Sequence, residues 1–163
     1  MLSRLAYSIT QVLILSACVF SLNTHAMNMT LPSLRGGQEQ VDVAQPGKLS
    51  VVMLFQPECS WCKKQAQQLT QLKQQCQQQF HISLIGTNGS KRQLKRSLKY
   101  YDKGLQAAIA SKVFLRKIGG FKASPTTIFY DETGNKVAKR RGYIQPDKFK
   151  NAIKLLSKGR CKL

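Results

Sequence analysis

The sequence predicts an α/β fold in which a central mixed β-sheet is flanked by helices. Strand-like and helix-like patterns alternate in the order β-α-β-α-β-β-α, which is typical of a single layered domain. Of the 163 residues, 42% are hydrophobic and 20% are charged, a balance that supports a buried core. The length corresponds to one domain at roughly 100–200 residues per domain, which excludes a multidomain enzyme.

Residues 1–26 are expected to form a secretory signal peptide. Arg4 gives a positive start, an apolar run follows, and the small residues Thr24 and Ala26 stand at positions −3 and −1 of a cleavage site after Ala26. Two alternatives stay open: an uncleaved membrane anchor, and a lipoprotein anchored at Cys18 within the lipobox-like sequence LSAC. Each alternative places the rest of the chain, 27–163, in the periplasm or another extracytoplasmic space.

The first elements of the domain are expected to be a short extended segment and a buried strand. Residues Gln40–Val43 alternate between polar and apolar side chains between two turn signals. Leu49–Phe55 (LSVVMLF) is a continuous apolar run with β-branched residues, and Pro57 follows it. Such a run predicts a central strand that is buried on both faces and has a parallel neighbour.

The segment from Trp61 to Phe80 predicts an amphipathic helix, and His81–Ile85 predicts a second strand. Apolar residues recur in the helical segment at spacings of three and four, and its other face is rich in Gln and Lys. The apolar stripe consists of Ala66, Leu69, Leu72, Cys76 and Phe80.

Residues 90–120 are expected to form a basic helical segment. Leu94, Leu98, Tyr101 and Leu105 would share one face, and Ala107–Ile118 would form a further helix. This segment holds nine Lys and Arg residues and one acidic residue, within a chain of net charge +19. It suits a solvated face, or an anionic surface such as lipid headgroups, envelope polymers or an acidic partner protein. Since no binding motif accompanies the charge, nucleic acid is not an expected partner.

The C-terminal part predicts a β-hairpin and a closing helix. Thr126–Tyr130 and Asn135–Arg141 are the two strands, joined by the turn sequence DETG. Pro146 begins the last helix, which ends near Gly159.

The sequence CSWC, residues 59–62, falls where the buried strand gives way to the first helix. Two intervening residues let both sulfurs meet across one helical turn, so the pair can cycle between dithiol and disulfide. Unpaired N–H groups and the helix dipole favour a thiolate at Cys59. Lys63 adds positive charge nearby, whereas Glu58 opposes it.

A metal site is not expected at this motif. Zinc would need four ligands, yet the only histidines are His25 and His81, and there is no second CxxC. A structural disulfide at residues 59–62 stays open beside the redox interpretation. After cleavage four cysteines remain, and an even number in an exported chain indicates pairing.

With these motifs in order, the chain resembles the thioredoxin superfamily, in particular its exported TlpA-like and Dsb-like thiol–disulfide oxidoreductases. The resemblance rests on the apolar strand before CSWC, on Ser124-Pro125 before a strand, on the hairpin through Gly134 and on Gly142 before the closing helix. It implies a thioredoxin-like fold with a helical insertion before the cis-Pro loop.

The resemblance also implies roles for single residues. Cys59 would be the attacking thiol and Cys62 the resolving thiol. Pro125 would be cis and would place the Ser124 backbone beside the disulfide, where the two residues would hold an extended substrate. Trp61 would face solvent beside the substrate groove, although a core position stays open. The implied partners are protein thiol or disulfide substrates and a membrane-bound redox partner, with no cofactor beyond the disulfide itself.

This sequence departs from thioredoxin at four positions in and around the motif. Met53 stands where thioredoxin has a buried Asp, Glu58 replaces the usual aromatic residue, and Ser-Trp replaces Gly-Pro between the cysteines. Because that dipeptide tunes the reduction potential in the family, the direction of electron flow (reductase, oxidase or isomerase) stays open.

Two further interpretations concern the remaining cysteines and the whole domain. In the resembled fold the first and last helices end side by side, so Cys76 and Cys161 are candidates for a structural disulfide; a buried free thiol at Cys76 is the alternative. The alternative to an enzyme is a non-catalytic thioredoxin-fold interaction module of an envelope or secretion assembly.

Overall fold

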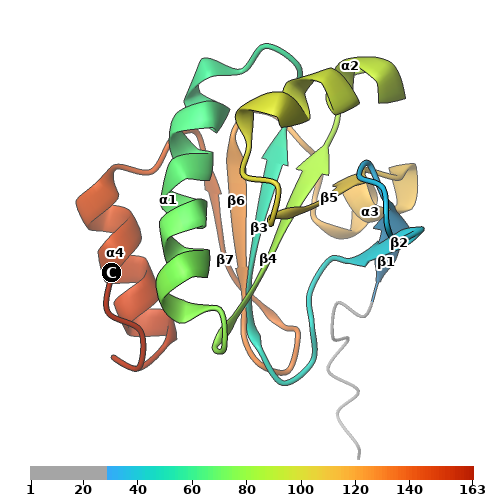
Figure 1. Cartoon of the computed structure of the whole chain (residues 1–163). Coiled ribbons are helices and arrows are strands. Elements are labelled where there is room, and N and C mark those ends of the chain that lie inside the picture. Colours follow the sequence, from blue (N-terminus) through green and yellow to red (C-terminus); the bar gives the residue numbers. More distant parts are fainter. Residues whose placement is uncertain (1–28) are drawn as a thin grey trace, which may run out of the picture.

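The computed structural model describes residues 29–163, so the predicted signal peptide and Cys18 lie outside the described residues. The described chain forms a five-stranded sheet covered by helices, together with a small two-stranded sheet (Figure 1). The elements are β1 (Thr30–Pro32), β2 (Gln40–Asp42), β3 (Leu49–Phe55), α1 (Ser60–Cys76), β4 (Phe80–Gly86), α2 (Lys91–Ser97), the 3₁₀ turn η1 (Leu98–Tyr100), β5 (Gln106–Ile109), α3 (Lys112–Lys117), β6 (Thr126–Tyr130), β7 (Lys136–Arg141) and α4 (Pro146–Leu156).

The main sheet is mixed and has the strand order β5-β4-β3-β6-β7. β3 lies at its centre, parallel to β4 and antiparallel to β6, so Val51 stands opposite Ile82 on one side and Phe129 on the other. All seven residues of β3 are buried, because helices cover both faces of the sheet. The predicted fold class and the central strand are therefore confirmed.

The pleat of β3 divides its side chains between two apolar clusters. Val51, Met53 and Phe55 point into the cluster formed with α1, the α2 region and α4. Val52 and Leu54 point into the cluster formed with α3 and the β1–β2 hairpin. Each such large side chain stabilises the fold by about 1.5–3 kcal/mol when fully buried.

Helix α1 follows the predicted apolar stripe but ends one turn early. Cys62, Leu69 and Cys76 are buried on its inner face. The helix stops at Cys76, whose carbonyl accepts a hydrogen bond from the Gln79 N–H at 3.0 Å. Phe80, expected on the helix, is instead the first residue of β4, because the turn at 77–79 reverses the chain toward the sheet.

The expectation of helix throughout residues 90–120 is wrong in its middle. Helix α2 begins at a capping box between Ser90 and Gln93 and passes into η1. The chain then turns at Asp102, whose carboxylate accepts from the Gly104 N–H at 2.8 Å, and enters strand β5. The expected Ala107–Ile118 helix is therefore a strand followed by the short helix α3.

The ends of α1 and α4 are joined on one face of the sheet (Figure 1). Cys161, just beyond α4, is bonded to Cys76 at the end of α1, with a Cα–Cα distance of 5.8 Å. Cys161 is also held by its N–H, which donates to the Ser157 hydroxyl at 3.2 Å. These contacts fasten the C-terminal tail to the helix that carries the CSWC motif.

Among residues 29–163, no helix has both the length and the apolar character needed to span a membrane.

Candidate functional site

Cys59 and Cys62 are joined in a disulfide at the start of α1. The S–S distance is 2.11 Å and the Cα–Cα distance is 5.2 Å. Cys59 is the N-cap residue of the helix, and its sulfur accepts the Cys62 N–H at 3.1 Å. Cys62 is fully buried, whereas Cys59 is half-buried. Cys59 is therefore the sulfur that an incoming thiol can reach, and the helix N-terminus would stabilise negative charge on it.

The turn between β3 and α1 places Cys59 at the helix start. Glu58 has a φ of 59°, in the left-handed region that costs a residue with a side chain roughly 1–2 kcal/mol. Its side chain is exposed, so the backbone position rather than side-chain packing defines its place in the turn. This conformation could not be predicted from the residue type, since Gly and Asn are the residues that usually adopt it.

The loop before β6 brings Ser124 to the buried sulfur. The Ser124–Pro125 peptide bond is cis, and the Ser124 hydroxyl lies 3.0 Å from the Cys62 sulfur. The loop is held from two sides: the Thr126 hydroxyl donates to the Ala123 carbonyl at 2.6 Å, and the Gly142 N–H donates to the Pro125 carbonyl at 2.7 Å. The motif identified in the sequence therefore lies directly beside the disulfide.

Trp61 and Tyr143 form an aromatic rim on one side of the disulfide. Trp61 is 50% exposed, and its ring centroid lies 5.2 Å from that of Tyr143. Helix α1 positions the loop that carries Tyr143. The Gln68 side-chain amide donates to the Tyr143 hydroxyl at 3.1 Å, and the Gln65 side-chain oxygen Oε1 accepts from the Ile144 N–H at 2.9 Å. Tyr143 was not predicted as a site residue, because it lies far along the chain from CSWC and in no periodic pattern.

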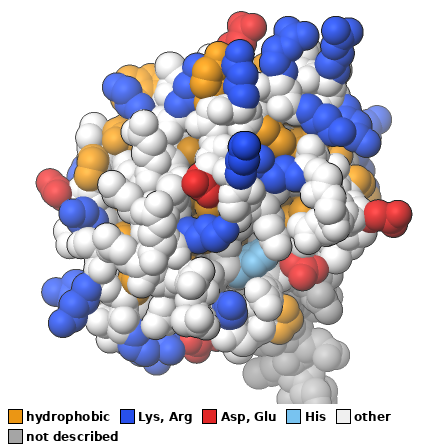
Figure 2. Space-filling model, viewed as in Figure 1, with side chains coloured by type: hydrophobic (Ala, Val, Ile, Leu, Met, Phe, Trp, Pro, Cys, Tyr) orange, Lys and Arg blue, Asp and Glu red, His pale blue; other side chains and the backbone are white. Residues whose placement is uncertain are grey.

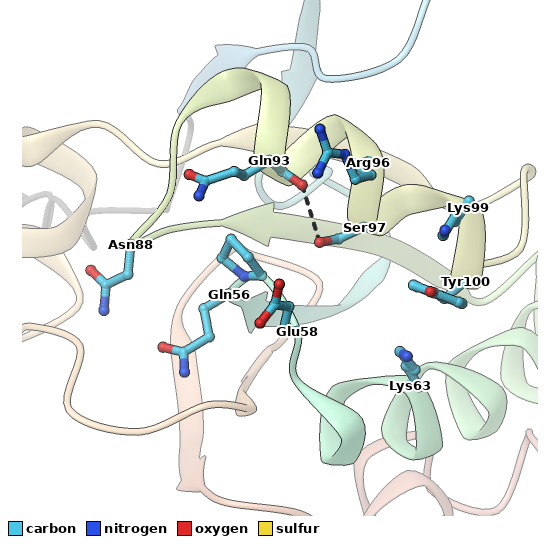
Figure 3. Close-up of a pocket in the computed structure, with 10 residues that line it drawn as sticks. Gln56, Glu58, Lys63, Asn88, Gln93, Arg96, Ser97, Lys99 and Tyr100 are labelled. Atoms are coloured by element: carbon cyan, nitrogen blue, oxygen red, sulfur yellow. Dashed lines mark hydrogen bonds between the residues drawn. The ribbon is translucent and has the colours of Figure 1, made fainter.

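A second rim, on the side of α2, is cationic. The Lys63 ammonium lies 3.5 Å from the centroid of the Tyr100 ring, and the Lys99 ammonium lies 4.9 Å from it. These side chains line a pocket of about 480 Å³ that also includes Glu58 and Arg96 (Figure 3). The pocket therefore borders the CSWC motif.

The floor under the disulfide is apolar at the position where thioredoxin carries an acid. Met53 is fully buried and packs in the same cluster as Cys62. Within residues 29–163 no Asp or Glu is buried. The polar groups on this side are instead neutral: the Ser124 hydroxyl, and the hydroxyl of Thr127, which stands opposite Met53 in the sheet and has no hydrogen-bond partner.

The histidine considered as a metal ligand has a structural contact. The His81 ring nitrogen Nε2 lies 2.9 Å from the Asp42 carbonyl oxygen, and burial lowers the pKa of His81. In the part of the chain that the structure describes, no three His, Cys, Asp or Glu side chains gather as a metal site would require.

The sequence matches the family of thioredoxin-like domains over residues 37–157, which is most of the chain. The chain belongs to the thioredoxin-like family. The predicted superfamily is thereby confirmed. Membership and the bonded Cys59–Cys62 pair together support a thiol–disulfide oxidoreductase.

Solved structures with the same fold come from several bacteria. A thiol:disulfide interchange protein of the thioredoxin family from Chlorobium tepidum TLS aligns with a TM-score of 0.68 at 20% identity, over 80% of this thioredoxin-like chain and 94% of its own. The exposed lipoprotein thioredoxin Etrx1 of Streptococcus pneumoniae aligns with a TM-score of 0.64 at 20% identity, over 78% of this chain and 98% of its own. A secreted Mycobacterium tuberculosis disulfide oxidoreductase homologous to Escherichia coli DsbE aligns with a TM-score of 0.65 at 15% identity, over 82% of this chain and 99% of its own. The comparison with curated proteins finds no match.

Proposed function

We propose that this protein is an extracytoplasmic, periplasmic thiol–disulfide oxidoreductase that exchanges disulfides with protein substrates through Cys59 and Cys62. The observation that carries the proposal is the asymmetry of the pair. Cys59 is half-buried at a helix N-terminus, whereas Cys62 is fully buried and faces the Ser124 hydroxyl. One sulfur is thus accessible for attack and the other is protected until it resolves the intermediate.

The reaction is a pair of thiol–disulfide exchanges. In the reducing direction, the Cys59 thiolate attacks one sulfur of a substrate disulfide, forms a mixed disulfide and releases the other substrate sulfur as a thiolate. The Cys62 thiolate then attacks the Cys59 sulfur and releases the second substrate sulfur. Two electrons pass from the pair to the substrate; in the oxidising direction the same steps run in reverse.

The residues around the pair supply binding and orientation. The Ser124 hydroxyl lies 3.0 Å from the Cys62 sulfur, and the backbone of Ser124 and Pro125 would align an extended substrate segment. Trp61, half-exposed against Tyr143, offers a rigid aromatic surface next to the reacting sulfur. Because no acid is buried under the pair within the described residues, the Ser124 hydroxyl is the group that would stabilise the Cys62 thiolate by donating a hydrogen bond.

The proposed location rests on the predicted signal peptide at 1–26. The secreted oxidoreductase of Mycobacterium tuberculosis and the exposed lipoprotein of Streptococcus pneumoniae share the fold and support it. A membrane-bound partner that resets the pair would determine the direction of exchange. The mass of the exported chain tests the location: cleavage after Ala26 leaves a chain that begins at Met27, whereas lipidation at Cys18 would leave a longer chain carrying acyl groups.

Exchange with a peptide disulfide tests the activity itself. The reduced protein should reduce a peptide disulfide, or the oxidised protein should oxidise the matching dithiol, and the change of Cys59 to Ser should abolish either reaction. Equilibration with a redox buffer then gives the reduction potential of the pair. A potential well below about −300 mV, together with no exchange, would mark a structural bond and favour the non-catalytic interaction module.

A further inference from the structure

We propose that the cationic pocket beside Cys59 binds a carboxylate side chain of the substrate polypeptide, so that the enzyme prefers disulfides flanked by acidic residues. The cationic pocket is the hollow of about 480 Å³ lined by Glu58, Lys63, Arg96, Lys99 and Tyr100, among others. The inference rests on the proposed function and deepens it by naming a substrate class. It also gives a role to part of the basic segment 90–120.

The pocket lies within reach of a substrate joined to Cys59. Glu58 directly precedes Cys59 and Lys63 directly follows Cys62, so the residues on both sides of the CSWC motif line the pocket. The opposite wall comes from α2 and η1, through Arg96 and Lys99 (Figure 3). An extended chain advances about 3.3 Å per residue, so side chains two to three positions from the reacting substrate cysteine would arrive at this pocket.

The charges of the pocket are arranged to receive an anion. Lys63 and Lys99 place their ammonium groups 3.5 and 4.9 Å from the centroid of the same Tyr100 ring. The ring attracts both groups, but two like charges at one ring also repel each other. A carboxylate beside them would relieve that repulsion, and it would meet cations that are already positioned.

These cations have no carboxylate partner in the described part of the protein. The ion pair formed there joins Arg160 to Glu132, away from the redox motif. The pocket contains three cations and one carboxylate, that of Glu58. Figure 3 shows Lys63, Lys99 and Tyr100 together on one side of the pocket, with Glu58 nearer to the start of α1.

This arrangement sets the position of the preferred acidic residue. Glu58 adjoins Cys59, so it disfavours an acidic residue directly next to the substrate cysteine. The lysines and Tyr100 lie farther along the pocket and favour an acidic residue two or three positions away. Figure 2 shows Lys and Arg side chains dispersed over the visible face, so general attraction of anions by the net charge of +19 has to be separated from this local effect.

The test uses peptide disulfides that differ only at the second and third positions from the cysteine, where they carry Glu, Gln or Lys. The wild-type protein should exchange with the Glu peptide about three- to tenfold faster than with the Gln peptide, as expected for one or two partly screened ion pairs. The Lys peptide should be the slowest. In the double variant Arg96→Gln and Lys99→Gln, the ratio of Glu to Gln rates should fall toward one.

A matched control separates the pocket from the net charge. Lys150 and Lys154 are exposed on α4, and changing both to Gln removes the same charge far along the chain from the pocket. This control should keep the wild-type ratio. If the ratio of Glu to Gln rates falls equally in both double variants, the preference comes from the net charge of the protein and the proposal is overturned. A ratio near one in the wild-type protein would also overturn it.

Two further outcomes identify other failures. If the wild-type protein exchanges with none of the peptides, the proposed function itself fails. The absolute exchange rates therefore test the function, whereas their ratio tests the pocket. Co-sedimentation with phosphatidylglycerol vesicles tests whether the pocket binds a membrane instead. If the wild-type protein binds the vesicles and the Arg96 and Lys99 variant does not, while the variant keeps the wild-type ratio of peptide rates, the pocket binds a membrane surface and the proposal is overturned.

Discussion

The hydroxyl oxygen of Ser124 lies 3.0 Å from the sulfur of Cys62. This contact joins a loop residue to the buried half of the redox pair across 62 positions of sequence. It is the polar contact that the structure gives to the Cys62 sulfur in a floor that contains Met53 in place of an acid. In the proposed mechanism, the chemistry of Cys62 would therefore depend on a neutral hydroxyl.

Changing Ser124 to Ala should slow the resolving step of exchange. A hydrogen bond to a charged group contributes about 1.5–3 kcal/mol, so its loss should slow the attack of Cys62 on the mixed disulfide by about tenfold or more. Rapid-quench measurements should show the mixed disulfide accumulating in this variant. Ser124→Thr retains the hydroxyl and should restore most of the rate; an Ala variant that resolves as fast as the wild type would remove Ser124 from the mechanism.

The two cysteines should respond differently to replacement. Cys59→Ser should abolish exchange, because the half-buried sulfur makes the first attack. Cys62→Ser should leave that attack intact and trap substrates on Cys59, since the buried residue can no longer release them. Mass spectrometry of trapped complexes gives the result, and adducts on Cys62 in the Cys59 variant would reverse the assignment.

Removal of the Cys76–Cys161 bridge should lower stability and spare activity. The bridged residues are 85 positions apart, so the chain-entropy relation gives about 4.6 kcal/mol of stabilisation at most. The bridge lies at the end of α1 opposite to Cys59, so exchange should stay close to the wild-type rate. Denaturant titration of the Cys76→Ala and Cys161→Ala double variant measures the loss. With Cys59–Cys62 oxidised, two free thiols in the unfolded mature chain that begins at Met27 would show that the bridge does not form in solution.

The fold should lose stability at alkaline pH through Tyr101. Burial raises the pKa of this hydroxyl from 10.0 to about 12, so the unfolded chain ionises at a lower pH than the folded one. The stability that the neutral Tyr101 contributes is complete below pH 10.0 and is lost as the pH approaches about 12.

Tyr101→Phe should make this alkaline loss less steep. Some loss should persist, because burial raises the pKa of Tyr130 as well. Denaturant titrations at several pH values between the two limits measure the slope, with Tyr100→Phe as an exposed control. The same slope in the wild type and the Tyr101 variant would contradict the assignment.

The sequence predicted the elements whose patterns are local and missed those that depend on their neighbours. The apolar run Leu49–Phe55 coincides with β3, because a strand buried on both faces needs apolar residues throughout. Strand β5 (QAAI) contains two alanines, which favour helix by intrinsic propensity. It is a strand because Ala108 pairs with Ile85 on one side, while the Leu34 N–H donates to the Ala107 carbonyl on the other.

The candidate site likewise combines contacts that the local sequence predicts with contacts that it does not. Cys59 and Cys62 are three positions apart, so their spacing alone was enough to predict their contact. The place of Ser124 beside them followed from the resemblance to a family. The contacts of Trp61 with Tyr143 and of Lys63 with Tyr100 join separate elements through side-chain packing, and no local pattern in the sequence encodes them.

The burial of the second disulfide has a consequence for how the protein matures. Cys161 is 1% exposed and Cys76 is 4% exposed. The packed helix ends therefore shield this bridge from thiol reagents that can reach the half-buried Cys59. A bond hidden in this way has to form while the tail is still open to an oxidant, before α4 closes against α1. In the proposed function this enzyme acts on the disulfides of other proteins, yet it first needs an oxidant for its own thiols. A cell that lacks such an oxidant would leave Cys76 and Cys161 unbonded and the C-terminal tail unattached to α1.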